Sequence, residues 1–380
     1  LKRLLAYHSI ENIGIIGIGI GTGCIGLGIH NHGMMVLGFS GALLHTLNHS
    51  LFKSALFYSA GNVYLETRTT NIEKLGGIIK FMPLTAVLFL LSAVAICGLP
   101  PLNGFVSEFL IFGGIFNWIS NAGLVGMMVI GFSLLSLVFI GGLAVLCFTK
   151  AFSIIFLGNE RTVYSEQRKE AGFLQLLPIY LAGGMMILIG LFPSLFINLL
   201  TQPVSLFTGQ LVPCSSAMNF DALDSLQKIN YLSLTLILII LVIIIFKRLI
   251  TGRREVITGP TWGCAYPEAG PKLQYTANSF IRSYSKLAKP FLEIGKNEIE
   301  ITNVFPSKNH YDTQPYDKLE RYLIDLPLKY IKLFFGWFLF LQNGKLQRYI
   351  LYGIVFILSV ICIPLFIDKI SNFFQLLIQL

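Results

Sequence analysis

The sequence predicts an all-α protein that crosses a lipid bilayer several times. Hydrophobic residues make up 54% of the 380 residues, charged residues only 12%, and the mean hydropathy is +0.71. Soluble domains contain about 25% charged residues, so this composition argues against a soluble fold. Apolar runs of about 18 residues or more recur along the chain, and each can cross a bilayer as one helix.

We expect one membrane span for each long apolar run. The second run can form two helices or one kinked helix, and Pro100 and Pro101, followed by Gly104, separate the third run from the fourth. Two adjacent prolines remove two N–H donors, and a broken backbone at membrane depth needs protein or water to satisfy it. The expected spans are 6–29, 34–64, 82–99, 103–119, 123–148, 173–200, 229–250 and 348–367.

The segment 251–345 is polar and differs from the rest of the chain. Its start, Gly259 to Cys264, has the composition of a loop. Between Asp317 and Phe340 charged and apolar residues alternate at helical spacing. Such a stretch suits either a helix in the plane of the membrane interface or a solvent-side helix packed on a partner, and both alternatives stay open.

The net charge of +9 does not indicate a nucleic-acid partner, because basic residues such as Lys247 and Arg248 directly follow a span. This is the pattern of cytoplasmic loops in membrane proteins. The six cysteines are scattered and form no C-x-x-C pair. We therefore expect no iron–sulfur cluster, zinc or other cofactor in this chain.

His45, His49 and Lys53 form the sharpest motif, because each lies four residues after the previous one. Four residues turn a helix by about 40° beyond a full turn and climb about 6 Å, so the three side chains share one stripe. Histidine titrates near neutral pH and water can bridge the gaps, as a proton relay requires. Two alternatives remain. H-x-x-x-H can bind zinc, although Thr46 replaces the glutamate of a metalloprotease motif, and each histidine can simply bond to nearby backbone.

Other ionisable residues also fall inside apolar runs, where a charge costs about 2.5–3.5 kcal/mol. Glu108 follows the proline break and suits a wet cavity or a lysine partner such as Lys53, or else a structural bond to backbone. Lys2 begins the first span, where it can serve a relay or simply reach the interface. His8 and Glu11 are three residues apart and share a helix face.

Two further motifs are interpreted as structural or meaningless. Gly21 to Gly26 fits G-x-G-x-x-G but lies in an apolar run without a preceding strand, so it indicates close helix packing. Asn48-His49-Ser50 matches a glycosylation sequon within a predicted span.

These residues together resemble the proton-conducting antiporter-like subunits of respiratory complex I, Mrp-type cation/proton antiporters and membrane-bound hydrogenases. Leu1 to Ile10 resembles the family's helix start K-x-x-L-A-Y-S-S-I, and the histidine–lysine stripe and Gly98 to Phe105 with Glu108 complete the resemblance. Within the family, the chain is most similar to the large subunit (component B) of formate hydrogenlyase and hydrogenase-4-type complexes. Glu11 to Gly14, Thr261 to Cys264 and Leu273 to Ala277 carry that similarity.

The resemblance implies a fold of two inverted repeats, of which this chain carries the second, with extra C-terminal transmembrane helices. Because the chain opens at Leu1 within a span, we expect an N-terminal half to precede it. The implied parts are a transporter domain at 1–200, an added helix with its preceding loop at 201–250, the polar segment with its amphipathic helix at 251–345, and a final span at 346–380.

The resemblance also implies a function: proton translocation coupled to electron transfer in partner subunits that carry iron–sulfur clusters and nickel–iron. Lys2, His45, His49, Lys53 and Glu108 would form the proton pathway, with His8 as an extra titratable group where a serine is usual. The implied partners are other membrane subunits and a peripheral redox arm in a bacterial or archaeal cell membrane. The alternatives are a stand-alone cation/proton antiporter subunit, with H⁺ or Na⁺ as the ion, and a non-conducting scaffold.

Overall fold

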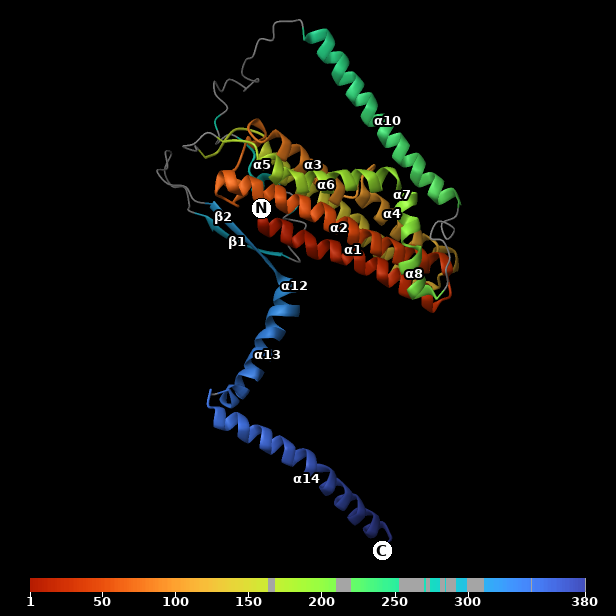
Figure 1. Ribbon diagram of the computed structural model, residues 1–380, viewed down its shortest axis with the longest axis vertical. Coiled ribbons are helices and arrows are strands. Elements are labelled where there is room, and N and C mark those ends of the chain that lie inside the picture. The colour runs from red at the N-terminus through yellow and green to blue at the C-terminus, as the bar shows by residue number, and fades with distance from the viewer. Residues whose placement is uncertain are drawn as a thin grey trace. The chain divides into compact units, whose positions relative to one another are not determined.

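The computed structural model describes residues 1–162, 168–209, 220–252, 270, 274–280, 284, 292–298, 311–342 and 344–379. The chain divides into two compact units, Leu1–Phe280 and Ile281–Leu380. The first unit contains membrane-length and shorter helices, and those from α1 to α8 pack side by side in a bundle (Figure 1). Its helices are α1 (Lys2–Gly28), α2 (His32–Thr67), α3 (Pro83–Ile96), α4 (Asn103–Phe116), α5 (Leu124–Phe156), α6 (Phe173–Leu191), α7 (Pro193–Leu199), α8 (Thr201–Thr208) and α10 (Phe220–Thr251), with short 3₁₀ turns at Ile72–Lys74, Ile78–Lys80 and Ile119–Asn121.

The helix α2 organises this bundle, because α1, α3, α4 and α6 all pack against it. It is a single helix of 36 residues. The side chain of Asn31 caps its start by accepting the Met34 N–H at 3.0 Å, and the helix ends at Arg68, which has a left-handed φ of 54°. The second predicted span is therefore one helix rather than two.

Glycines let α1 and α2 approach closely. A Cβ built on Gly38 would lie 2.5 Å from the backbone nitrogen of Gly23, and one on Gly26 would lie 2.5 Å from the nitrogen of Met35. Neither position can therefore hold a larger residue without moving a helix backbone. This confirms the packing interpretation for Gly23 and Gly26, whereas Gly21 has open space around it.

The predicted helix break lies between α3, which ends at Ile96, and α4, which begins at Asn103. Gly98 adopts a left-handed φ of 63°, and the Pro100–Pro101 peptide bond is cis. A Cβ on Gly104 would lie 2.0 Å from the carbonyl oxygen of Ala95, so the first turn of α4 rests directly on the last turn of α3. The break therefore depends on glycine as well as proline.

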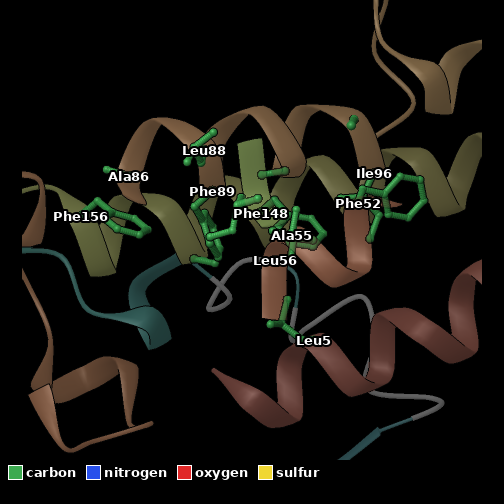
Figure 2. Packing of buried hydrophobic residues seen from close by; sticks show 14 of the residues in the cluster. Leu5, Phe52, Ala55, Leu56, Ala86, Leu88, Phe89, Ile96, Phe148 and Phe156 are labelled. Carbon is green, nitrogen blue, oxygen red and sulfur yellow. The ribbon is translucent and has the colours of Figure 1, made fainter. Parts of the chain in front are cut away.

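An apolar core joins α2, α3, α5 and α6. Phe52 and Leu56 of α2 lie among Phe89 of α3 and Phe148 and Phe156 of α5, and all five are buried (Figure 2). A second cluster joins α2 and α4 with α6 and α7, around Leu44, Val106, Leu110 and Ile189. These clusters hold α2 and α4, two of the three helices that carry the predicted pathway residues, and Leu5 of α1 belongs to the first cluster.

Five described helices are long and apolar enough to cross a membrane: Lys2–Gly28, Leu124–Phe156, Phe173–Leu191, Ser225–Thr251 and Leu346–Pro364. The helices α3 and α4 are shorter, and the proline break lies after the last residue of α3 and before the first residue of α4. The helix α2 has the length, but its polar residues lower its hydropathy. The predicted span 173–200 was wrong as one helix, since Phe192 and Pro193 separate α6 from α7.

The second unit contains elements that the sequence analysis did not predict. Strands β1 (Leu292–Glu298) and β2 (Tyr311–Asp317) pair antiparallel, from Leu292 opposite Asp317 to Glu298 opposite Tyr311. Leu292 and Ile294 alternate with polar neighbours, which is the two-residue period of a strand. The prediction of a loop was therefore too simple at these two stretches, although the chain remains predominantly helical.

Helical turns follow the strand pair over most of the predicted amphipathic stretch. They are α12 (Lys318–Glu320), a π-helical turn (Arg321–Asp325), α13 (Leu326–Gly336) and a 3₁₀ turn (Trp337–Leu341), after which α14 runs over Leu346–Gln379. Apolar residues such as Leu323 and Phe334 are exposed. Whether a membrane interface or a partner covers them stays a prediction. The predicted loop from Gly259 to Cys264 lies outside the described residues.

Candidate functional site

An unbroken series of side-chain hydrogen bonds links α1, α2 and α4 in the interior of the bundle. Its centre is His45 of α2, which is 1% exposed. The Nε2 atom of His45 lies 3.2 Å from Oδ1 of Asn12 on α1, and its Nδ1 atom lies 2.9 Å from Oγ of Ser107 on α4. Both ring nitrogens are thus occupied by side chains from two neighbouring helices.

The series continues from Ser107 into a pair of asparagines. The Nδ2 atom of Asn48 donates to Oγ of Ser107 at 2.9 Å and to the carbonyl oxygen of Asn103 at 2.7 Å. In return, Nδ2 of Asn103 donates to Oδ1 of Asn48 at 3.0 Å. Asn48, Asn103 and Ser107 are fully buried, so these bonds replace the water that the groups lose on folding.

The three members of the predicted stripe have different surroundings. Lys53 is buried, and its Nζ donates to the carbonyl oxygen of Leu5 on α1. His49 is partly buried, and its Nε2 has no hydrogen-bond partner among the described residues. The ring of Phe52 lies near both histidines, with centroid distances of 6.2 Å to the His45 ring and 5.7 Å to the His49 ring. The helical spacing brings the three onto one stripe, but no hydrogen bond joins them directly.

His8 and Glu11 form an ion pair on α1, as their spacing predicts. The His8 ring packs against Phe148 of α5 with a centroid distance of 4.6 Å, and the carbonyl oxygen of His8 accepts a bond from Asn12 at 2.7 Å. Glu11 is close enough for its charge to act on both Lys53 and Glu108.

Glu108 lies against the broken helix. A Cβ built on Gly98 would lie 2.6 Å from one carboxylate oxygen of Glu108, so the missing side chain at Gly98 makes the space that the carboxylate occupies. The expected pairing with Lys53 is not seen: within the described part of the chain the two residues have different neighbours. A carboxylate next to an unwound backbone is the arrangement that the sequence predicts.

Lys2 is the one predicted pathway residue that is exposed rather than buried or half-buried. It lies at the start of α1. Its place in a relay stays a prediction.

Sequence reasoning missed Asn12, Asn48, Asn103 and Ser107. A signal for them exists in the sequence, because Asn12 follows His8 by four residues, Asn48 follows His45 by three, and Ser107 precedes Glu108. Each of these three is a polar residue within an apolar run, close along the helix to an ionisable residue, whereas Asn103 precedes Glu108 by five residues. The predicted list included charged and titratable groups and left out the amides and the hydroxyl that connect them.

A second polar cluster ties the segment after α10 to the loops at the ends of α2 and α5. The side-chain amide of Gln274 makes two bonds of 3.0 Å with the backbone of Asn159. Arg161 pairs with Glu73 at 3.2 Å, and Glu73 also accepts the backbone N–H of Ala277 at 2.8 Å. Of the tail motif used for the resemblance, Gln274 to Ala277 thus have a structural role. Leu273 and Thr261 to Cys264 lie outside the described residues.

No metal site accompanies these clusters in the described residues, since no three His, Cys, Asp or Glu side chains converge there. For His45 the reason is direct, because Asn12 and Ser107 occupy both ring nitrogens. The zinc alternative for the two histidines therefore has no support in the geometry.

Comparison with known proteins assigns this arrangement to a family. Residues 1–136, which contain α1 to α4 and every residue of the network, match the family described as NADH:quinone oxidoreductase/Mrp antiporter, transmembrane. These residues belong to that family. The match confirms the resemblance inferred from the motifs, and with the apolar helices it makes the chain a multi-pass membrane protein.

Curated relatives extend the likeness. The chain is 45% identical over 167 residues to formate hydrogenlyase subunit 3 of Escherichia coli (strain K12), covering 44% of this chain and 27% of that protein. It is 33% identical over 273 residues to hydrogenase-4 component B of the same organism, covering 70% of this chain and 40% of that protein. The chain thus spans less than half the length of either relative.

A solved structure supports the fold. The membrane-bound sulfane sulfur reductase, an archaeal respiratory membrane complex, contains a chain that aligns with 94% of this one at a TM-score of 0.57 and 20% identity. The alignment covers 51% of that chain. The antiporter-like membrane fold is therefore shown.

Proposed function

We propose that the protein is a proton-translocating membrane subunit of a respiratory or hydrogenase-type complex. The observation that carries the proposal is the buried series from Asn12 through His45 and Ser107 to Asn48, with the His8–Glu11 pair, Lys53 and Glu108 on the same three helices. Buried polar and ionisable groups at membrane depth are costly and are usually functional. Here Asn103, Ser107 and Glu108 place one end of the series at the helix break between α3 and α4.

Electrostatic coupling supplies the mechanism. The charge of Glu11 acts on both Lys53 and Glu108. A proton that neutralises Glu11 therefore removes an attraction that favours the charged form of Lys53. Moving one charge across 100 mV costs about 2.3 kcal/mol. Two unit charges about 4 Å apart interact by about 4 kcal/mol at an effective dielectric of about 20, so rearranging one such pair is enough. We place Lys2 at the outer end of the pathway and His49 beside its centre.

The partners follow from the relatives' names. We propose that electrons pass through iron–sulfur and nickel–iron centres of other subunits, in a peripheral arm attached to a bacterial or archaeal cell membrane, and that this chain has no redox centre. A second candidate is cation/proton antiport without a redox partner, which the family description favours because it includes Mrp antiporters.

Proton uptake into vesicles that contain the assembled complex tests the proposal. We expect Lys53→Ala and Glu108→Gln each to lower redox-driven uptake at least about ten-fold, because each removes a charge-carrying site. Lys80→Ala is the control, since Lys80 is an exposed lysine in the turn between α2 and α3. Unchanged uptake in both pathway variants would favour the scaffold. Uptake that needs a Na⁺ gradient and no electron donor would favour the antiporter.

A further inference from the structure

The orientation of the network amides is set by backbone carbonyls, which can only accept hydrogen bonds. Asn12 contacts the carbonyl oxygen of His8, so the atom at that contact must be its NH₂ group. The same argument orients Asn48, whose NH₂ group contacts the carbonyl oxygen of Asn103. Each asparagine therefore presents a known atom to the centre of the network: Asn12 presents an acceptor, and Asn48 a donor.

The side of His45 that faces α1 follows from this orientation. Its Nε2 lies 3.2 Å from Oδ1 of Asn12, which has no hydrogen to give. The Nε2 atom must then carry the hydrogen, in both the neutral and the charged ring. Any proton that His45 gains or loses is therefore exchanged at Nδ1, which faces Ser107 on α4.

The hydroxyl of Ser107 has one hydrogen and two acceptors within reach. It lies 2.9 Å from Nδ1 of His45 and 3.0 Å from the carbonyl oxygen of Gly104, one turn earlier on its own helix. Its oxygen already accepts a hydrogen from Asn48 at 2.9 Å. The hydrogen can point to His45 only when Nδ1 is bare, and must point to Gly104 when Nδ1 carries a proton.

We infer that Ser107 is a positioning residue whose hydroxyl rotates between His45 and Gly104 as His45 loses and gains its proton. In the neutral state Ser107 donates to Nδ1. In the charged state Nδ1–H donates to Ser107, and Ser107 donates to Gly104. Asn12 and Asn48 keep their bonds in both states. No buried donor is left unpaired in either charge state of His45, so the change in hydrogen bonding amounts to one hydroxyl rotation, and the burial of the charge is a separate cost.

The inference rests on the proposed function for its role in transport. The residue that responds to the charge of His45 would be Ser107, which directly precedes Glu108 on α4. The buried or half-buried titratable groups on the helices packed against α2 are His8 and Glu11 of α1, Glu108 of α4, and Cys147 and Lys150 of α5. The helices α3, α6, α7 and α8 carry no Asp, Glu, Lys, Arg or His, and α2 itself adds His32, His49, Lys53 and Glu66.

Nitrogen-15 NMR of the full-length protein in lipid vesicles, labelled at histidine, tests the inference. We expect the neutral His45 signal, identified by its loss in His45→Gln, to show hydrogen on Nε2 and a bare, hydrogen-bonded Nδ1. Ser107→Ala should shift the Nδ1 resonance and leave Nε2 unchanged. Ser92→Ala should change neither, although Ser92 is also a buried serine that donates to its own helix, at 2.9 Å. A neutral ring with hydrogen on Nδ1, or an Nδ1 signal indifferent to Ser107→Ala, would overturn the inference.

Proton uptake by the assembled complex separates this inference from the proposed function. We expect Ser107→Ala to slow uptake about ten-fold, which corresponds to about 1.4 kcal/mol, while Ser92→Ala has no effect. If the NMR results are as expected but Lys53→Ala leaves uptake unchanged, the proposed function fails and the hydroxyl assignment stands. If Lys53→Ala slows uptake and Ser107→Ala does not, the role of Ser107 in transport fails.

Discussion

The two halves of α2 carry similar polar residues, but the hydrogen-bond partners of these residues differ. In the first half, His32 to Asn48, the side chains of His45 and Asn48 have partners on α1 and α4. In the second half, His49 to Thr67, buried polar atoms of His49, Ser59 and Asn62 have no hydrogen-bond partner among the described residues. The side chains around His45 are thus paired with neighbouring helices, whereas three in the second half are not. At the start of the first half, Nε2 of His32 also has no hydrogen-bond partner among the described residues.

Packing differs in the same way. Gly38 in the first half lies against the backbone of α1, whereas Gly61 in the second half has no atom within 4 Å of the position of a Cβ. Gly61 and Asn62 line a groove of about 450 Å³ between α2 and α6. The comparison teaches that the network around His45 forms where α1 and α2 are in close contact. Close contact does not pair every group, since Oδ1 of Asn103 and the fully buried Oγ of Ser59 have no partner among the described residues.

The largest expected effect comes from filling the close contact. We expect Gly38→Ala to lower the free energy of unfolding by about 3 kcal/mol, because the new Cβ would lie 2.5 Å from the nitrogen of Gly23 and would push α1 away from α2. Gly61→Ala is the matched control and should be neutral or stabilising by up to about 1 kcal/mol. Reversible unfolding of the purified protein in mixed detergent micelles measures both. Equal effects of the two variants would show that the halves do not differ in packing.

A smaller effect is expected from removing one amide of each half. Asn48→Leu removes one partner each from Oγ of Ser107 and from the carbonyl oxygen and Nδ2 of Asn103, so we expect a loss of about 2–3 kcal/mol. Asn62→Leu removes an amide whose Nδ2 has no partner among the described residues and should change stability by less than about 0.5 kcal/mol. The same unfolding experiment applies. A large loss in Asn62→Leu would indicate that a bound water or lipid uses that amide.

The smallest effect is expected at Ser59. Its hydroxyl oxygen is buried and has no hydrogen-bond partner among the described residues, so Ser59→Ala should be neutral or stabilising by about 0.5 kcal/mol. Ser107→Ala, by contrast, should cost about 1–2 kcal/mol because it breaks the bonds to His45 and Asn48. Unfolding midpoints of the two variants, measured side by side, give the sign of each change. Destabilisation by Ser59→Ala would place a structural water in the second half of α2.

The sequence by itself determined the membrane class, the helix break at Pro100 and Pro101, and the spacing that places His8 with Glu11. These features are local: a long apolar run needs a helix, two prolines end one, and residues three apart share a face. The same reasoning missed the strand pair at 292–298 and 311–317. In each stretch the alternation of side chains is short, and only pairing with the other stretch stabilises it as a strand. It also joined α6 and α7, because the apolar run continues across Phe192 and Pro193.

Only the tertiary structure decided which polar residues meet. Sequence spacing puts His45, His49 and Lys53 on one stripe, but it does not say that α1 and α4 supply Asn12 and Ser107 to His45. Nor does it say that Glu108 occupies the space left by Gly98 rather than pairing with Lys53. A hydrogen bond needs its two atoms within about 3 Å, and residues dozens of positions apart reach that distance only through the packing of whole helices.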